Sequence, residues 1–201
     1  MTMLGPLSIV IAYLLGGIPF GFLLVKFTKG ADVRESGSGN IGATNVLRTT
    51  GRVAGVATLL LDIAKGYVAV WLAAKLTGGA PEWTSLAALA VMAGHAYPVF
   101  LKFQGGKAVA TFIGAFAYLA FLPLAAVLLL FVAVVAVTRY ISAASILAAA
   151  AFPFGVWMIL HPPVQVTAAA FIAGAFVVYR HKSNWARLRT GVENRFSWGP
   201  Q

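Results

Sequence analysis

Six long apolar runs take up most of this 201-residue chain. They lie at about residues 4–25, 53–76, 84–101, 108–138, 141–160 and 164–179. A helix needs roughly 20 apolar residues, each rising about 1.5 Å, to cross a hydrocarbon core about 30 Å thick. Because 60% of the residues are hydrophobic and only 10% are charged, a soluble core of this size could not bury them. We predict an all-α, polytopic integral membrane protein, with residues 1–201 forming a single transmembrane domain.

The fourth run, 108–138, decides the topology because it is long for one span. If it crosses once, the tail from Arg180 lies opposite the basic loop 26–52; if it turns back near Ala120–Pro123, both lie on one side. The positive-inside rule favours the turn. This predicts about seven transmembrane helices, including a short helical hairpin at about 108–138, with the N-terminus outside and the C-terminus in the cytoplasm. The first arm, 108–121, would be only about 21 Å long.

The chain is strongly basic, with 15 Lys and Arg against five Asp and Glu, a formal charge of +10. Such an excess suggests anionic headgroups or anionic substrates, although positive-inside topology explains part of it and nucleic acid is the weaker interpretation. We expect residues 180–201 to form a basic interfacial tail on membrane lipids. There is no Cys, which excludes disulfides and thiolate metal sites, and the few His and acidic residues leave little for a metal. We expect neither a metal nor a cofactor.

Polar residues gather in three segments, and the predicted topology places all three at one membrane face. The first, 35–48, contains three Gly that let the backbone approach a ligand, and its N–H groups could form an anion-binding nest. This suits a phosphate; the alternative is a flexible Gly-Ser loop with a helix N-cap. The candidate phosphate-binding residues are Gly37, Gly39, Asn40, Gly42, Thr44 and Asn45, and the candidate catalytic residues are Ser38 and Arg48.

In the second segment, 94–111, Gly105, Gly106 and Lys107 open an apolar helix. Backbone N–H groups, the positive end of the helix dipole and an ammonium group then converge on one point, which again predicts an anion. We take Gly105 and Gly106 as phosphate-binding and Lys107 as catalytic. The alternative is a Gly turn beside an interfacial Lys that reaches lipid headgroups. His95 suits a hydrogen-bonded packing residue better than a catalyst.

The third segment, 179–195, has the pattern of a basic interfacial helix with Trp185 and Leu188 towards lipid. His181 and Asn184 are three residues apart and share one helical face, so both are candidate catalytic residues. Ser142 follows Arg139-Tyr140 at the same predicted face and is a candidate binding residue.

Asp62 and Lys65 lie three residues apart inside the second apolar run. A charge near the bilayer centre costs about 2.5–3.5 kcal/mol on insertion scales, so these two should neutralise each other. We interpret them as structural; the lesser alternative is that they help to position a site residue.

Several enzyme classes lack their motifs in this chain. There is no clustered carboxylate pair, no Gly-x-Ser-x-Gly, no His-Glu-x-x-His, and no His followed five residues later by Asp. What remains is a basic, Gly-lined anion site beside lipid, which suits a phosphorylated soluble substrate meeting a hydrophobic one.

The three segments, in order and spacing, resemble the bacterial acyl-phosphate:glycerol-3-phosphate acyltransferases. The shared motifs are Gly-Ser-Gly-Asn-x-Gly-Ala-Thr-Asn near an Arg, then Gly-His-x-Tyr-Pro-x-Phe with Gly-Gly-Lys, then Tyr-Arg-His with Asn, Arg-Leu, Thr-Gly and Glu. The resemblance covers residues from about 13 to 196. Ala108 departs from it where the family usually has Gly, and Ser183 and Ala186 replace polar residues common in the family.

The resemblance implies transfer of a fatty acyl group from acyl-phosphate to the 1-hydroxyl of glycerol 3-phosphate, giving lysophosphatidate for phospholipid synthesis. It implies seven helices, a bacterial cell membrane, an active site towards the cytoplasm, and a functional link to a soluble enzyme that produces acyl-phosphate. Neither acyl-CoA nor acyl-carrier protein would be the direct donor.

We expect Arg48, Lys107, Ser38 and the Gly-rich backbones to hold the phosphates, and His181, Ser142 and Asn184 to orient glycerol 3-phosphate. A substrate phosphate oxygen would take the hydroxyl proton; the alternative is His181 as general base. Two other functions compete with the enzyme: a small-anion or phosphate-ester transporter, and an assembly subunit with a lipid-binding basic belt.

Overall fold

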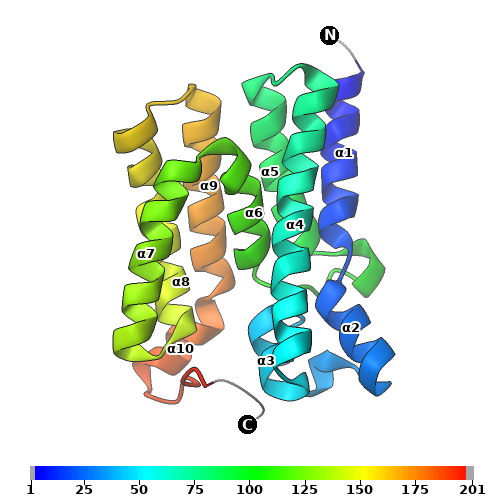
Figure 1. The fold of residues 1–201 in the computed structure, drawn as a ribbon, viewed down its shortest axis with the longest axis vertical. Helices are drawn as coiled ribbons and strands as arrows, with labels where there is room; N and C mark the ends of the chain where they lie inside the picture. Colours follow the sequence, from blue (N-terminus) through cyan, green and yellow to red (C-terminus); the bar gives the residue numbers. More distant parts are fainter. Residues whose placement is uncertain (1–2, 198–201) are drawn as a thin grey trace. The chain divides into compact units, whose positions relative to one another are not determined.

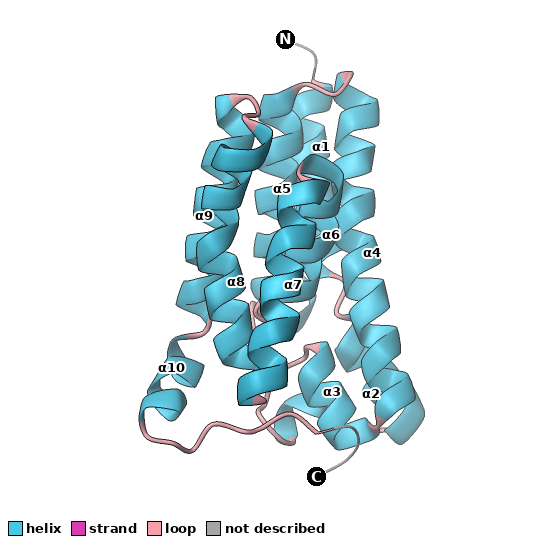
Figure 2. Ribbon diagram, turned by 60° about the vertical axis from the view of Figure 1, so that its left-hand side comes forward, coloured by secondary structure: helices cyan, strands magenta, loops and turns pink. Residues whose placement is uncertain are grey.

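The computed structural model describes residues 3–197, and within them the regular structure is helical (Figure 2), which confirms the all-α prediction. Residues 198–201 of the predicted interfacial tail lie outside the described part. The longer helices are α1 (Leu4–Gly17), α2 (Phe20–Lys29), α3 (Ala43–Thr50), α4 (Arg52–Thr77), α5 (Pro81–Ala96), α6 (Val109–Leu119), α7 (Phe121–Thr138), α8 (Ile141–Gly155), α9 (Val164–Arg180) and α10 (Lys182–Arg189). Short helical turns η1 (Val33–Glu35), η2 (Val99–Leu101) and η3 (Val156–Leu160) complete the set.

The chain divides into two compact units, with the boundary inside α6. The first unit runs to Ala115, and the second runs from Phe116 to Phe196. The expectation of a single transmembrane domain over 1–201 therefore stays a prediction.

In the first unit, α1, α4 and α5 pack against one another (Figure 1). Glycine allows this close approach, because a Cβ at Gly16 would collide with the carbonyl oxygen of Val91, and one at Gly94 with that of Tyr13. Small residues at helix interfaces are how membrane helices bring their backbones together. The same device brings α4 to the start of α6, where Gly66 faces the Thr111 carbonyl.

In the second unit, α8 packs between α7 and α9. The end of α6 joins it through Phe116, whose ring meets the Phe152 ring edge to face at a centroid distance of 4.8 Å. Of the candidate spans, α7 is the most apolar and the least buried. Leu129 and Val132 are exposed on it, as expected of side chains that face lipid.

Five helical stretches of the described chain are long and apolar enough to cross a membrane: Leu4–Lys29, Arg52–Thr77, Pro81–Leu101, Phe121–Thr138 and Ile141–Leu160. A sixth is obtained if α9 and α10, bent by 54° at His181, count as one. The fourth apolar run breaks at Ala120, inside the predicted turn. Its first arm, α6, has only 11 residues, so the predicted count of seven is not confirmed.

Candidate active site

Asn45, in the first turn of α3, holds together the Gly-rich loop of the first unit, residues 36–44. It is 2% exposed, and its Oδ1 accepts the Ser38 N–H at 2.8 Å. Its Nδ2 donates to three carbonyl oxygens, those of Val33 and Ser36 at 3.1 Å and of Asn40 at 2.9 Å. The amide that the sequence predicted as phosphate-binding is thus occupied in shaping the loop.

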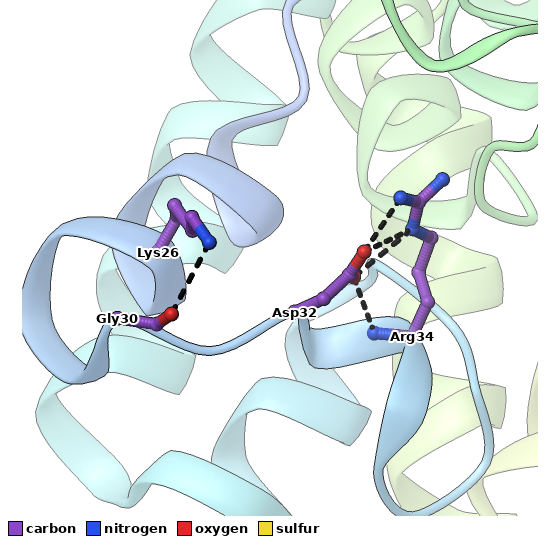
Figure 3. A network of polar contacts seen from close by, with 4 residues as sticks. All are labelled: Lys26, Gly30, Asp32 and Arg34. Carbon is purple, nitrogen blue, oxygen red and sulfur yellow. Dashed lines mark hydrogen bonds and ion pairs between the residues drawn. The ribbon is translucent and has the colours of Figure 1, made fainter.

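The loop is also held at its start by Asp32 and Arg34 (Figure 3). The Arg34 guanidinium grips both Asp32 oxygens, with Nε at 3.0 and 3.1 Å and a terminal nitrogen at 2.6 Å, and the Arg34 N–H donates to Oδ1 at 2.9 Å. The hydrogen bond from the Arg34 side chain holds the pKa of the Asp32 carboxyl below its ordinary value. Arg34 therefore serves this ion pair, and Arg48 is the loop's candidate cation for substrate.

The other polar residues of the first segment differ in exposure. Gly37 and Gly39 have positive φ angles of 59° and 68°, which explains Gly at both positions. Ser38 and Thr44 are exposed, and Arg48 is half-buried one turn after Thr44 on α3. Asn40 Oδ1 accepts the Gly42 N–H at 2.8 Å just before α3 begins.

An apolar cluster places the Gly-rich loop beside the second polar segment. Leu101 of η2 packs with Val33, Ile41 and Val46, which lie before, within and after the loop, and with Val25 of α2. The structure therefore brings the first two predicted segments together on one core.

Gly105 and Gly106 lie against His95, the penultimate residue of α5. The Gly106 N–H donates to the His95 carbonyl at 3.1 Å. A Cβ at Gly105 would collide with that carbonyl oxygen, and one at Gly106 with Nε2 of the imidazole. Neither glycine has a positive φ, so space and not conformation requires them. Lys107, half-buried, follows directly.

Ala108 comes next and has a φ of 61°, which a residue with a side chain rarely adopts. The conformation explains why the resemblance leads us to expect Gly there. Its methyl group is 1% exposed and packs inside the unit.

The predicted pairing of Asp62 with Lys65 is confirmed at 2.8 Å. The sequence did not predict that His95 joins them, with Nδ1 3.6 Å from the same Asp62 oxygen. All three side chains are buried in the first unit.

In the second unit, the Glu193 carboxylate accepts hydrogen bonds from three side chains. Its Oε1 accepts from Asn184 Nδ2 at 2.7 Å and from Ser142 Oγ at 2.9 Å, and its Oε2 accepts from Arg187 Nε at 2.7 Å. Burial raises the pKa of this carboxyl, but the three hydrogen bonds lower it further, so the pKa lies below its ordinary value. Sequence reasoning proposed no role for Glu193.

His181 lies at the bend between α9 and α10 and is 3% exposed. Its Nδ1 is 2.7 Å from the Val177 carbonyl oxygen. Because a carbonyl only accepts, Nδ1 carries the proton, and in the neutral ring Nε2 holds the lone pair. Asn184, three residues later in α10, is also buried.

The two units thus each gather part of the predicted set. Ser38, Thr44, Arg48 and Gly105–Lys107 belong to the first, and Ser142, His181 and Asn184 to the second. Within residues 3–197, no three His, Asp or Glu side chains are grouped as metal ligands would be.

The sequence model of the glycerol-3-phosphate acyltransferase family matches residues 6–191. The chain belongs to this family. A glycerol-3-phosphate acyltransferase from Geobacter sulfurreducens is 49% identical over 186 residues, which cover 92% of this chain and 94% of the relative. One from Desulforamulus reducens is 47% identical over 190 residues, with 92% of each chain covered.

Two crystal structures of PlsY (YgiH), an integral membrane glycerol 3-phosphate acyltransferase, have the same fold. Its glycerol 3-phosphate form gives a TM-score of 0.90 at 38% identity, covering 96% of each chain. Its lysophosphatidic acid form gives a TM-score of 0.87 at 37% identity, covering 96% of this chain and 95% of that one. As a member of this family, the protein is a multi-pass membrane enzyme, and the transporter alternative is not favoured.

Proposed function

We propose that this glycerol-3-phosphate acyltransferase takes its acyl group from acyl-phosphate and places it on the 1-hydroxyl of glycerol 3-phosphate. The products are lysophosphatidate and inorganic phosphate. The observation that supports this most is the pair of Gly-containing loops packed on one apolar cluster, each with a candidate cation, Arg48 or Lys107. PlsY, which the chain resembles over nearly its whole length, has glycerol 3-phosphate and lysophosphatidic acid forms.

Arg48 and Lys107 hold substrate phosphate and offset the negative charge that develops on the carbonyl and the leaving group. Ser38 and Thr44, which are exposed and precede Arg48 in the first polar segment, donate hydroxyl hydrogen bonds to phosphate oxygens. Gly37 and Asn40 contribute backbone N–H groups to the phosphate site. The N–H groups of Gly39, Gly42 and Gly106 donate to the Ser36 carbonyl, to Asn40 Oδ1 and to the His95 carbonyl, so these glycines shape the two loops that border the site, as does Gly105. Asn45 acts as a positioning residue, because its amide is bound within the loop.

Ser142, His181 and Asn184 orient glycerol 3-phosphate. Glu193 fixes the first and third of these by accepting both on one oxygen. His181 presents Nε2 as an acceptor for a substrate hydroxyl, since Nδ1 is bound to the Val177 carbonyl.

The reaction needs no strong base. The glycerol 1-oxygen attacks the acyl carbonyl carbon, the bond from that carbon to the phosphate oxygen breaks, and phosphate leaves. A substrate phosphate oxygen takes the hydroxyl proton, and positioning supplies most of the rate. The alternative is that His181 removes the proton, because the tautomer with the proton on Nδ1 leaves the lone pair on Nε2.

The same proposal places the enzyme in the bacterial cell membrane with its C-terminus and site towards the cytoplasm, because the Lys and Arg residues concentrate in the segments assigned to that side. A soluble enzyme must then deliver acyl-phosphate from the cytoplasm.

The assignment is tested by acylation of labelled glycerol 3-phosphate from palmitoyl-phosphate with Lys107→Met and its matched control Lys102→Met. Both variants remove one cation from the same loop, but Lys102 is exposed and outside the Gly-Gly-Lys turn. We expect Lys107→Met to lower kcat/KM at least about 100-fold and Lys102→Met to leave it within about threefold. Equal effects of the two changes would contradict the role of Lys107.

A further inference from the structure

A buried charged network connects the middle of α4 to the Gly105–Gly106 turn. Asp62 and Lys65 are 1% and 5% exposed and lie 2.8 Å apart, and Nδ1 of His95 approaches the same Asp62 oxygen at 3.6 Å. The last distance is that of an electrostatic contact and not of a good hydrogen bond. None of these residues has a role in the proposed chemistry.

Stability alone is a poor explanation for such a network. Charges inside a membrane segment are costly, and replacing a buried ion pair by apolar residues of similar volume is often neutral or stabilising. What these groups touch is more informative than their pairing.

At one end of the network, Lys65 holds the short connection between α1 and α2 in place. Lys65 Nζ donates to the Ile18 carbonyl at 2.8 Å, where α1 ends and α2 has not begun, and it lies 5.6 Å from the centroid of the Phe20 ring. The ammonium group therefore holds the start of α2, which leads to the Gly-rich loop.

The other end fixes the Gly-Gly-Lys turn. The His95 carbonyl, in the last turn of α5, accepts the Gly106 N–H at 3.1 Å. The imidazole stands so close that a Cβ on Gly106 would collide with Nε2. Asp62 on one side and Gly106 on the other thus determine the position of the ring, and Lys107 follows at once.

We propose that Asp62, Lys65 and His95 are positioning residues that hold the Gly105–Gly106 turn, and through it Lys107, in the conformation that binds substrate phosphate. This rests on the proposed function of Lys107. The ion pair supports the His95 ring, and the ring and carbonyl of His95 support the glycine backbone.

The main test uses Asp62→Asn combined with Lys65→Met, which removes both charges together and leaves no buried charge unpaired. Ser85→Ala is the control, because it removes another buried polar group from α5, away from the turn. Two quantities are measured in detergent: amide hydrogen exchange of peptides covering residues 103–107, and KM and kcat for glycerol 3-phosphate with palmitoyl-phosphate.

In the double variant only, we expect faster exchange at 103–107, a KM about tenfold higher and a lower kcat, because Lys107 both holds substrate phosphate and offsets the charge that develops in the reaction. A folded double variant with parental exchange and KM would overturn the proposal. Faster exchange with unchanged kinetics would overturn the link between the support of the turn and substrate binding. Lys107→Met, compared with Lys102→Met, tests the role of Lys107 itself, so failure of this proposal and failure of the proposed function are distinguishable.

If the double variant does not fold, His95→Gln tests the proposal in its place. It keeps a polar side chain and the backbone carbonyl but removes the ring from between Asp62 and Gly106. The same two readouts apply, and parental values for both would overturn the proposal.

Discussion

The side-chain amide of Asn184 donates to Oε1 of Glu193 at 2.7 Å, and the same oxygen accepts the Ser142 hydroxyl at 2.9 Å. One carboxylate therefore aligns two candidate substrate-binding groups from α10 and α8. The side chain of Glu193 is only 6% exposed, so its partners are not readily replaced by water.

Glu193→Gln should weaken this arrangement, because it removes the charge and one of the two accepting oxygens. We expect a loss of about 2 kcal/mol in the free energy of unfolding and a raised KM for glycerol 3-phosphate. Thermal unfolding in detergent and steady-state kinetics measure both. Glu82→Gln, an exposed change in the first turn of α5, is the control and should alter neither.

Stability should fall in acid through the same carboxylate. The folded-state pKa of Glu193 lies below the ordinary 4.5, so the unfolded chain takes up its proton first as pH drops. Its contribution is complete above about pH 4.5 and is lost as pH falls from there through the folded-state pKa. Asp32 acts in the same direction from its ordinary 3.8. Unfolding temperatures of the parent between pH 6 and 3 should drop more than those of Glu193→Gln; parallel curves would contradict the assignment.

Asn45→Ala should disrupt the Gly-rich loop. It leaves three carbonyl oxygens without their donor and the Ser38 N–H without its acceptor. We expect a loss of about 3 kcal/mol in stability together with most of the activity. Thr28→Val, which removes one hydroxyl from the exposed end of α2, is the matched control. A stable, active Asn45→Ala enzyme would show that the loop does not depend on this amide.

Arg48→Lys should be damaging although the charge is kept, because an ammonium group does not reproduce the planar fork of a guanidinium. The expected loss in kcat/KM is at least about tenfold. Arg52→Lys, an exposed change at the start of α4, controls for the substitution itself. Near-parental turnover by Arg48→Lys would remove Arg48 from the phosphate site.

His181→Gln separates the two routes for the hydroxyl proton. If a substrate phosphate takes the proton, Gln retains a polar group for orientation and substantial turnover remains. If His181 is the base, the loss should be about 100-fold or more, and the pH–rate profile should lose its acidic limb. Single-turnover rates across pH 5.5–8.5 distinguish these outcomes.

Much of the fold could be predicted from local properties of the sequence. Apolar runs gave the spans, and charge distribution predicted the break that the structure has at Ala120. The length of α6 was harder to predict. Its 11 residues are too few to cross a bilayer as a straight helix, so whether they form a span depends on how the helix packs and not on its composition.

The candidate site was less predictable, because its residues act through contacts distant in sequence. The role of Asn45 as a scaffold depends on carbonyls up to 12 residues away. The contact of His95 with Asp62 joins two helices, and spacing along one helix cannot reveal it. One feature of the sequence did point to Glu193. Gly191 follows the basic helix, as Gly commonly does at a helix end, and its positive φ of 73° turns the chain so that Glu193 returns to Asn184.

Acyl-phosphate, and not acyl-CoA, is the acyl donor in the proposed reaction. The most direct test of this is single-turnover acylation of labelled glycerol 3-phosphate by purified enzyme in detergent, with palmitoyl-phosphate in one reaction and palmitoyl-CoA in another. We predict lysophosphatidate with palmitoyl-phosphate and none above background with palmitoyl-CoA. Product from palmitoyl-CoA alone would show that acyl-phosphate is not the donor.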